Sequence, residues 1–291
     1  MSRPVLEIKG ICKAFPGVVA NHNATLSVLK GEVHAIVGEN GAGKTTLMNI
    51  LYGLQQPDAG TIRVRGETVQ ISSPRVAKRL GIGMVHQHFM LVPSFTVAQN
   101  VVLGYEPTRK GVIVDRRHAE AAVGALCERY NLSLPLSEPV ANLPVGVQQR
   151  VEIIKAIYRG ADVLILDEPT AVLTPLEVRE LFRICREMAN RGKTILFISH
   201  KLREVLALSD RVTVMREGRT VATLTTHGTD EHELARLIVG RDRIWAIRKD
   251  RMDGNGPVAL QVKALEVRGP QHTLAVTLRT GYKPGGFSGN A

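Results

Sequence analysis

The sequence has few cysteines, few aromatic residues and no long apolar run. Only three of its 291 residues are cysteine, Cys12, Cys127 and Cys185, and their spacing fits neither a disulfide framework nor a zinc site. We interpret them as reduced thiols of a cytosolic protein. No apolar stretch approaches the roughly 18 residues of a membrane-spanning helix, and residues 1–10 are too polar for a secretory signal. Disulfide-scaffold and integral-membrane proteins are therefore excluded.

The remaining composition is that of an ordinary globular chain. Hydrophobic residues make up 44% and charged residues 22%, which is enough apolar material for a buried core. The net charge of +11 is unevenly distributed: residues 1–240 contain 29 basic and 23 acidic side chains, and the last 51 residues contain 9 and 4. Because nearly half of the excess lies in a short tail, we interpret the tail as solvated, with docking on a partner as the alternative.

The order of the apolar segments predicts an α/β protein. Residues 163–167 and 194–199 are continuously apolar and flanked by helical patterns, as expected for central strands of a parallel sheet covered on both faces. Capping boxes at 96–99 and 174–177 predict two helix starts, and the second helix places Cys185 on its buried side. Shorter strands are predicted at residues 5–9, 33–37, 61–64, 68–71, 212–214 and 220–224.

A glycine-rich pattern, G-x-x-x-x-G-K-[ST], spans residues 38–45 and predicts a phosphate site. It lies between strand 33–37 and a predicted helix at 46–53, where backbone N–H groups favour anions. Lys44 is placed to reach the β- and γ-phosphates of a nucleotide, and Thr45 to ligate Mg²⁺. The alternative, a structural glycine turn, is disfavoured by this context. The predicted nucleotide-binding residues are Gly38, Asn40, Gly41, Gly43, Lys44, Thr45 and Thr46.

Acidic and histidine residues follow the two central strands. Asp167 ends the first strand and is predicted to hold Mg²⁺ through water, while Glu168 is predicted to act as the base that polarises the attacking water. His200 follows the second strand at the same carboxyl edge, where it is placed to contact the γ-phosphate. His86 and His88 have no neighbouring ligands that would complete a metal site.

In this order the motifs resemble those of the ATP-binding cassette (ABC) ATPases, over about residues 1–240. The matching segments are residues 38–45, 84–88, 143–150, 164–170 and 198–200. The resemblance implies that Gln87 contacts Mg²⁺ and senses a membrane partner, and that Phe15 lies against adenine. It also implies that Glu168 is the catalytic glutamate and His200 the switch histidine. A G domain is disfavoured because no Asn-Lys-x-Asp motif is present.

The signature segment departs from the family pattern Leu-Ser-Gly-Gly-Gln. Pro144 stands at the serine position and Val145 at the first glycine, whereas Gly146 is retained and Val147 replaces the glutamine. Proline has neither a hydroxyl nor an N–H to donate. Two phosphate contacts are therefore missing, each worth about 1.5–3 kcal/mol. The resemblance implies that Gly146 binds the nucleotide of an opposite cassette, and a helix is still predicted at 148–158.

Residues 15–21, 84–93, 168–174 and the altered signature resemble bacterial sugar and nucleoside importers, the nucleoside branch most closely. This resemblance implies a P-loop domain with a parallel core sheet, an antiparallel β subdomain and a helical subdomain. It implies ATP and Mg²⁺ as cofactors, and transmembrane permease subunits and a second cassette, in a homodimer or on a separate chain, as partners. A substrate-binding lipoprotein is implied indirectly, no nucleic acid is expected, and the location is cytoplasmic, peripheral on the inner face of the cell membrane.

The same resemblance divides the chain into a nucleotide-binding domain at 1–240, a linker at 241–256 and a truncated start of a second cassette at 257–291. Residues 257–263 repeat the pattern of the opening strand, but no P-loop lysine follows. The expected function is ATP hydrolysis coupled to nucleoside or sugar import. The alternatives are a soluble ABC protein acting on nucleic acid or ribosomes, disfavoured by the lack of long insertions, and an inactive truncated cassette.

Overall fold

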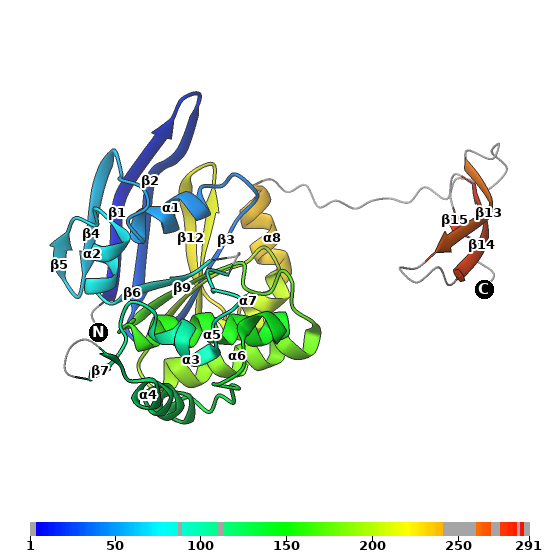
Figure 1. Ribbon diagram of the computed structural model, residues 1–291. Helices are drawn as coiled ribbons and strands as arrows, with labels where there is room; N and C mark the ends of the chain where they lie inside the picture. The colour runs from blue at the N-terminus through cyan, green and yellow to red at the C-terminus, as the bar shows by residue number, and fades with distance from the viewer. Residues whose placement is uncertain are drawn as a thin grey trace. The chain divides into compact units, whose positions relative to one another are not determined.

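The computed structural model describes residues 4–86, 89–109, 113–240, 260–268, 274–283 and 286–287. The chain divides into two units, Met1–Asp242 and Arg243–Ala291, which are described separately. A six-stranded sheet of order β12-β11-β3-β10-β9-β6 forms the centre of the first unit (Figure 1), and only the β11–β12 pair is antiparallel. Its strands are β3 (Val33–Val37), β6 (Ile82–Val85), β9 (Val163–Asp167), β10 (Thr194–Ile198), β11 (Arg211–Arg216) and β12 (Arg219–Thr225).

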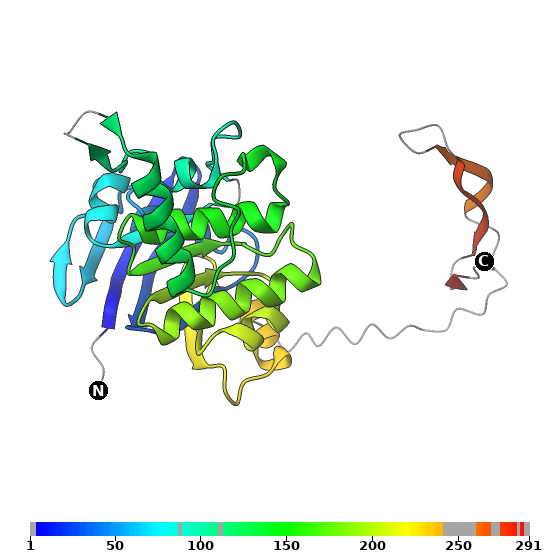
Figure 2. The same ribbon diagram turned by 60° about the horizontal axis from the view of Figure 1, so that its bottom comes forward.

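A second, antiparallel sheet of order β2-β1-β4-β5 lies beside the core sheet (Figure 2). Its strands are β1 (Pro4–Phe15), β2 (Val18–Leu29), β4 (Ala59–Val64) and β5 (Glu67–Val69), and a further small pair is formed by β7 (Thr108–Arg109) and β8 (Ile113–Val114). The helices are α1 (Lys44–Leu51), α2 (Pro74–Arg79), α3 (Val97–Val102), α4 (Arg116–Arg129), α5 (Val145–Tyr158), α6 (Pro175–Asn190), α7 (Leu202–Leu208) and α8 (Glu231–Val239), with a 3₁₀ turn at Val140–Asn142.

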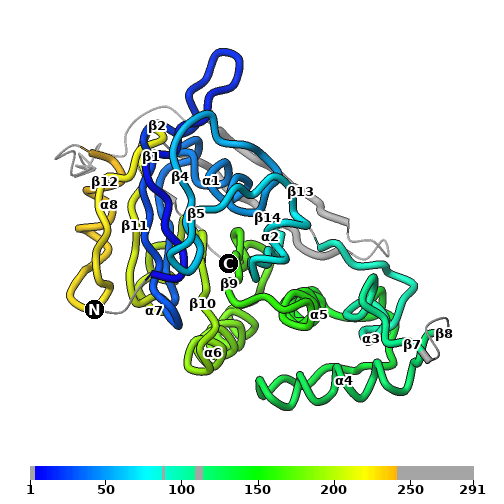
Figure 3. The backbone as a smooth tube through the Cα atoms, turned by 90° about the vertical axis from the view of Figure 1, so that its left-hand side faces the viewer, coloured from blue at the N-terminus to red at the C-terminus, as the bar shows by residue number. Residues whose placement is uncertain are grey.

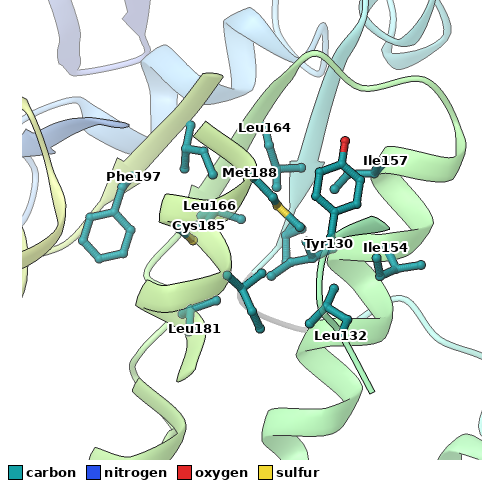
Figure 4. Packing of buried hydrophobic residues seen from close by; sticks show 14 of the residues in the cluster. Tyr130, Leu132, Ile154, Ile157, Leu164, Leu166, Leu181, Cys185, Met188 and Phe197 are labelled. Atoms are coloured by element: carbon teal, nitrogen blue, oxygen red, sulfur yellow. The ribbon is translucent and has the colours of Figure 1, made fainter. Parts of the chain in front are cut away.

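Alternation along the central strands produces two hydrophobic cores. Ile195 and Phe197 of β10 face one core, and Leu196 and Ile198 face the other, because successive side chains of a strand point to opposite faces. Helices α3–α8 cover the first core, and Figure 4 shows side chains of α5 and α6 packed within it; α1, α2 and the antiparallel sheet cover the second core. Helix α5 contacts β6, α3 and α4, and Figure 3 shows it between α6 and α3. This layering leaves the carboxyl ends of the parallel strands together at one edge.

The second unit contains a three-stranded antiparallel sheet. Its strands are β13 (Leu260–Arg268), β14 (Leu274–Lys283) and β15 (Gly286–Phe287), in that order. The strand predicted from the repeated pattern at 257–263 overlaps β13. Among the described residues of the whole chain, no helix combines the length and the apolar character that crossing a membrane requires.

The predicted fold class is confirmed. Strands β3 and β9 lie at the predicted residues, and both capping boxes are complete at the starts of α3 and α6. Two predicted helix starts were late: α1 begins at Lys44 rather than at 46, and α5 at Val145 rather than at 148. The buried position predicted for Cys185 is also observed, and burial raises the pKa of its thiol to about 12.

Candidate nucleotide-binding site

The loop between β3 and α1 folds around the ammonium group of Lys44. Its Nζ donates hydrogen bonds to the carbonyl oxygens of Gly38, at 2.7 Å, and Glu39, at 2.8 Å. Burial lowers the pKa of Lys44, and the negative charges of Glu168 and Asp167 act in the opposite direction. The lysine is therefore held within the loop, and its ammonium group interacts electrostatically with Glu168 and Asp167, the two carboxylates predicted to take part in nucleotide hydrolysis.

Gly43, the residue before α1, is held by a close contact with strand β2. It has a φ of 90°, and a Cβ atom there would collide with the carbonyl oxygen of Ala20. The fully buried Asn21 donates a hydrogen bond from Nδ2 to the carbonyl oxygen of Gly43, at 3.1 Å. Strand β2 thus supports the loop through Asn21, a residue that the sequence analysis did not identify, since its contact spans 22 residues of chain.

Three predicted residues come together at the carboxyl edge of β9 and β10. Glu168 follows β9 in the left-handed region, with a φ of 45°, which is unusual for a residue other than glycine. Its N–H donates to the carbonyl oxygen of Ile198 at 3.1 Å, and its Oε1 lies 3.2 Å from Nδ1 of His200. Burial and the charge of Glu168 raise the pKa of the neighbouring Asp167. The backbone is therefore strained at Glu168, the residue predicted to act as the base.

A pocket of about 440 Å³ joins this edge to the phosphate loop. It is lined by Gly38, Glu39, Asn40, Glu168, His200, Leu202, Ala235, Ile238 and Val239. The contribution of α8 (Glu231–Val239) was not predicted, although the Asp230 cap and the helical spacing of Leu234 and Ile238 before Gly240 indicate a helix. Of the other predicted loop residues, Gly41 and Thr45 are exposed and Thr46 is half-buried.

The donor atoms at this edge suit Mg²⁺. The exposed hydroxyl of Thr45 and the carboxylate of Asp167 are oxygen ligands of the kind that Mg²⁺ prefers. Within the described ranges, no group of three or more His, Cys, Asp or Glu side chains forms a metal site. Gln87, the third predicted ligand, lies outside the described residues.

Phe15 lies at the tip of the β1–β2 hairpin and is 39% exposed. The Nζ of Lys13 lies 5.6 Å from the centre of its ring and also pairs with Asp58 at 2.8 Å. The ring is thus accessible for stacking and already contacts a cation. Its predicted contact with adenine stays a prediction.

The first turn of α5 contains the altered signature. Pro144 is the N-cap residue and makes no side-chain cap, and Gly146 is buried against the side chain of Glu177. Hydrogen bonds from the backbone and side chain of Thr174, joined by one from the backbone of Gly146, lower the pKa of Glu177. The carboxylate of Glu177 on α6 therefore lies close to the start of α5. The predicted contact of Gly146 with a nucleotide of an opposite cassette is a separate interaction, which stays a prediction.

A strand, phosphate loop and helix, with an acidic pair and a histidine on neighbouring strands, define a P-loop nucleotide-binding domain. Residues 21–171, more than half of the chain, match the family described as ABC transporter. The chain belongs to the ABC transporter family, and its first unit is an ATP-binding cassette.

Relatives with known names agree with this assignment. The guanosine import ATP-binding protein NupO of Bacillus subtilis is 50% identical over 264 residues, which cover 91% of this chain and 51% of that protein. The nucleoside import ATP-binding protein NupA of Lactococcus lactis is 46% identical, over 94% of this chain and 53% of that protein. The glucose import ATP-binding protein TsgD13 of Haloferax volcanii is 43% identical, over 99% and 58%. The chain spans about half the length of these relatives.

Solved structures share the cassette fold. The ADP conformation of MJ1267, an ATP-binding cassette of an ABC transporter, has a TM-score of 0.70 and 25% identity, covering 82% of this chain and 96% of that one. The cbiO1 protein of Clostridium perfringens, part of the cbiONQ transporter complex, has a TM-score of 0.69 and 28% identity, with the same coverage.

Proposed function

We propose that this chain is an ATP-hydrolysing cassette of an importer and that residues 1–240 perform the reaction. The observation that supports this most directly is the convergence of the loop-held Lys44 with Asp167, Glu168 and His200 at one edge of the sheet. Each is a residue type used in phosphoryl transfer, and they come from three places in the fold: Lys44 from the phosphate loop, Asp167 and Glu168 from the end of β9, and His200 from the end of β10.

The proposed chemistry assigns one task to each side chain. Lys44 binds the β- and γ-phosphates as a cation, and the carboxylate of Glu168 orients and deprotonates the attacking water. His200, 3.2 Å from Glu168, contacts the γ-phosphate and keeps the glutamate side chain in place. Mg²⁺, held by Thr45 and Asp167, would supply charge neutralisation for the phosphates when bound. Gln87 is proposed as an additional ligand.

The names of the relatives support a nucleoside or a sugar as the imported substrate, with nucleosides favoured by the two bacterial nucleoside proteins. The partners proposed for the chain are a transmembrane permease, a second cassette and, indirectly, a substrate-binding lipoprotein. In this arrangement the chain is peripheral on the inner face of the cell membrane.

We also propose that residues 241–256 are a linker and that 257–291 begin a second cassette. The first described strands of each unit form an antiparallel pair, β1–β2 in the first and β13–β14 in the second, which supports this division. A second candidate function, an inactive half of a transporter, is favoured by Pro144, which offers no hydroxyl to a nucleotide across a cassette interface.

The molar mass of the Glu168→Gln variant, measured by light scattering with and without Mg-ATP, separates these proposals. The substitution removes the base and traps a closed pair of cassettes. A doubling of mass with Mg-ATP supports a homodimeric motor in which Gly146 acts in trans. ATP binding by a persistent monomer supports an inactive half that requires a second cassette, and an absence of ATP binding overturns both proposals.

A further inference from the structure

Three polar side chains form a buried row along helix α5. Gln149 is 2% exposed, and Glu152 and Lys155 are each 7% exposed. They follow one another at intervals of three residues, so they lie close to one face of the helix, while Ile154 and Ile157 pack into the core. Buried polar groups need partners, and each member of this row finds one on a loop outside the helix.

Gln149 connects α5 to the catalytic edge. Its Nε2 donates a hydrogen bond of 2.6 Å to the carbonyl oxygen of Pro169, the residue directly after Glu168. Because the acceptor is a backbone atom, the contact fixes the course of the chain at the end of β9. A displacement of the Pro169 carbonyl relative to α5 would stretch this bond.

Glu152 and Lys155 hold a single residue, Met90, from both sides of its backbone. The N–H of Met90 donates to Oε1 of Glu152 at 2.7 Å, and its carbonyl oxygen accepts from Nζ of Lys155 at 2.6 Å. The two side chains also pair with each other at 3.3 Å. The side chain of Met90 itself is 68% exposed. The helix therefore holds a surface segment by its main chain and leaves the side chain free.

A buried ion pair is a poor source of stability, because removing two charges from water offsets most of their attraction. Such a pair does fix geometry: its two charged groups match one donor and one acceptor of the same peptide backbone. The role that this arrangement favours is accurate placement of Met90 relative to α5, with little effect on the overall free energy of folding.

We propose that Glu152 and Lys155 are positioning residues that transmit nucleotide-dependent movement of α5 to the backbone at Met90. Gln149 connects the other end of the same row to Pro169, so that the catalytic edge and the surface segment move with one helix. The inference rests on the proposed function, since the movement requires ATP binding. It adds the side chains that carry the movement from the catalytic edge to the surface.

The test uses the full chain and follows amide hydrogen exchange of Met90 by NMR, with and without the non-hydrolysable analogue Mg-AMPPNP. The double variant Glu152→Leu and Lys155→Met replaces both charges by apolar groups of similar size, which preserves folding. We expect the Met90 amide to exchange at least tenfold faster in this variant. We also expect the nucleotide to alter its exchange in the wild type and not in the double variant.

Two controls separate positioning from general stability. Glu180→Gln breaks the partly exposed pair between Arg150 of α5 and Glu180 of α6, at 3.0 Å, and should leave the Met90 response unchanged. The single substitution Lys155→Arg keeps a cation at this position. It should therefore retain most of the nucleotide-dependent change in Met90 amide exchange. A variant that unfolds would lose its dispersed spectrum. In that case the double variant Glu152→Gln and Lys155→Met provides a second comparison, because it removes both charges together and still releases the carbonyl of Met90.

Nucleotide affinity, measured by calorimetry on the same samples, distinguishes a failure of the proposed function from a failure of the positioning role of Glu152 and Lys155. A wild-type chain that does not bind the analogue overturns the proposed function. Binding with a Met90 response that persists in the double variant, or with no Met90 response in the wild type, overturns the positioning role alone. Binding in both chains with a response confined to the wild type supports it.

Discussion

Helices α1 and α5 both begin at a motif that the family resemblance assigns to phosphate binding, but their first turns differ. At α1, the left-handed Gly43 precedes Lys44, the exposed Thr45 follows, and the first turn contains no acidic residue. At α5, Pro144 replaces a capping hydroxyl and the carboxylate of Glu177 meets the backbone of Gly146. A carboxylate from another helix therefore lies close to the start of α5, whereas the first turn of α1 has no acidic residue.

The difference bears on how two cassettes could close on a nucleotide. A helix N-terminus attracts negative charge through its free N–H groups and its dipole. Once a carboxylate occupies that position, an incoming phosphate must compete with it for the same donor. We therefore expect the P-loop to set the affinity for ATP, and the start of α5 to set how readily a second cassette joins.

The largest effect is expected from Lys44→Ala, which removes the cation predicted to bind phosphate at the start of α1. Two charge-assisted hydrogen bonds to phosphate are lost, each worth about 1.5–3 kcal/mol, so the affinity for Mg-ATP should fall by about 100-fold or more. Isothermal calorimetry measures this directly. Lys30→Ala removes an exposed lysine elsewhere and is the matched control. Equal ATP affinity in the two variants would contradict the role of Lys44.

An intermediate effect is expected from Pro144→Ser, which restores the serine of the family signature at the start of α5. The added hydroxyl and N–H provide donors that the proline lacks. In a Glu168→Gln background, we expect the ATP-dependent dimer to tighten by about tenfold, the equivalent of roughly one hydrogen bond to a charged group. Sedimentation equilibrium with Mg-ATP gives the dissociation constant. An unchanged constant would mean that residue 144 does not face the partner's nucleotide.

The smallest effect is expected from Glu177→Gln, which removes the charge at α5 and keeps the hydrogen-bond acceptor. Less competition for Gly146 should strengthen ATP-dependent dimerisation a few-fold, while the weakened capping box costs about 0.3–1 kcal/mol of stability. Urea unfolding and sedimentation measure the two effects.

The pH dependence of the wild type provides a second check on Glu177. The hydrogen bonds from Thr174 lower its pKa, so its stabilising charge is fully present above the ordinary glutamate value and is lost as the pH falls through the lowered one. The stability difference between wild type and Glu177→Gln should shrink in that acidic range. A difference that is independent of pH would contradict a charge effect.

Local sequence patterns correctly predicted those elements of the fold and the site that depend on residues close together in the chain. Strand β9, the phosphate loop and the Thr174–Glu177 capping box each involve residues a few positions apart, where periodicity and cap chemistry act directly. The start of α5 at Val145 was missed, although Pro144 directly before it was a signal for a helix start. A proline is acceptable at a helix N-terminus, where its absent N–H has no intrahelical partner.

The long-range contacts could not be predicted in this way. Glu177 meets Gly146 across 31 residues, and Glu152 reaches Met90 across 62. Both depend on how α5 packs against its neighbours, which helical periodicity alone does not determine. The spacing of three residues between Gln149, Glu152 and Lys155 was the one available indication of the buried polar row on α5. Polar residues at this spacing lie along one face of a helix.

The way α5 holds Met90 has a consequence for how such a cassette could diversify. Glu152 and Lys155 bind the N–H and carbonyl oxygen, which every residue except proline provides, so the hold does not depend on the side chain at position 90. That exposed position is free to change to suit a different neighbour while the internal mechanism stays the same. A single motor design could in this way be fitted to many assemblies by exchanging surface side chains alone.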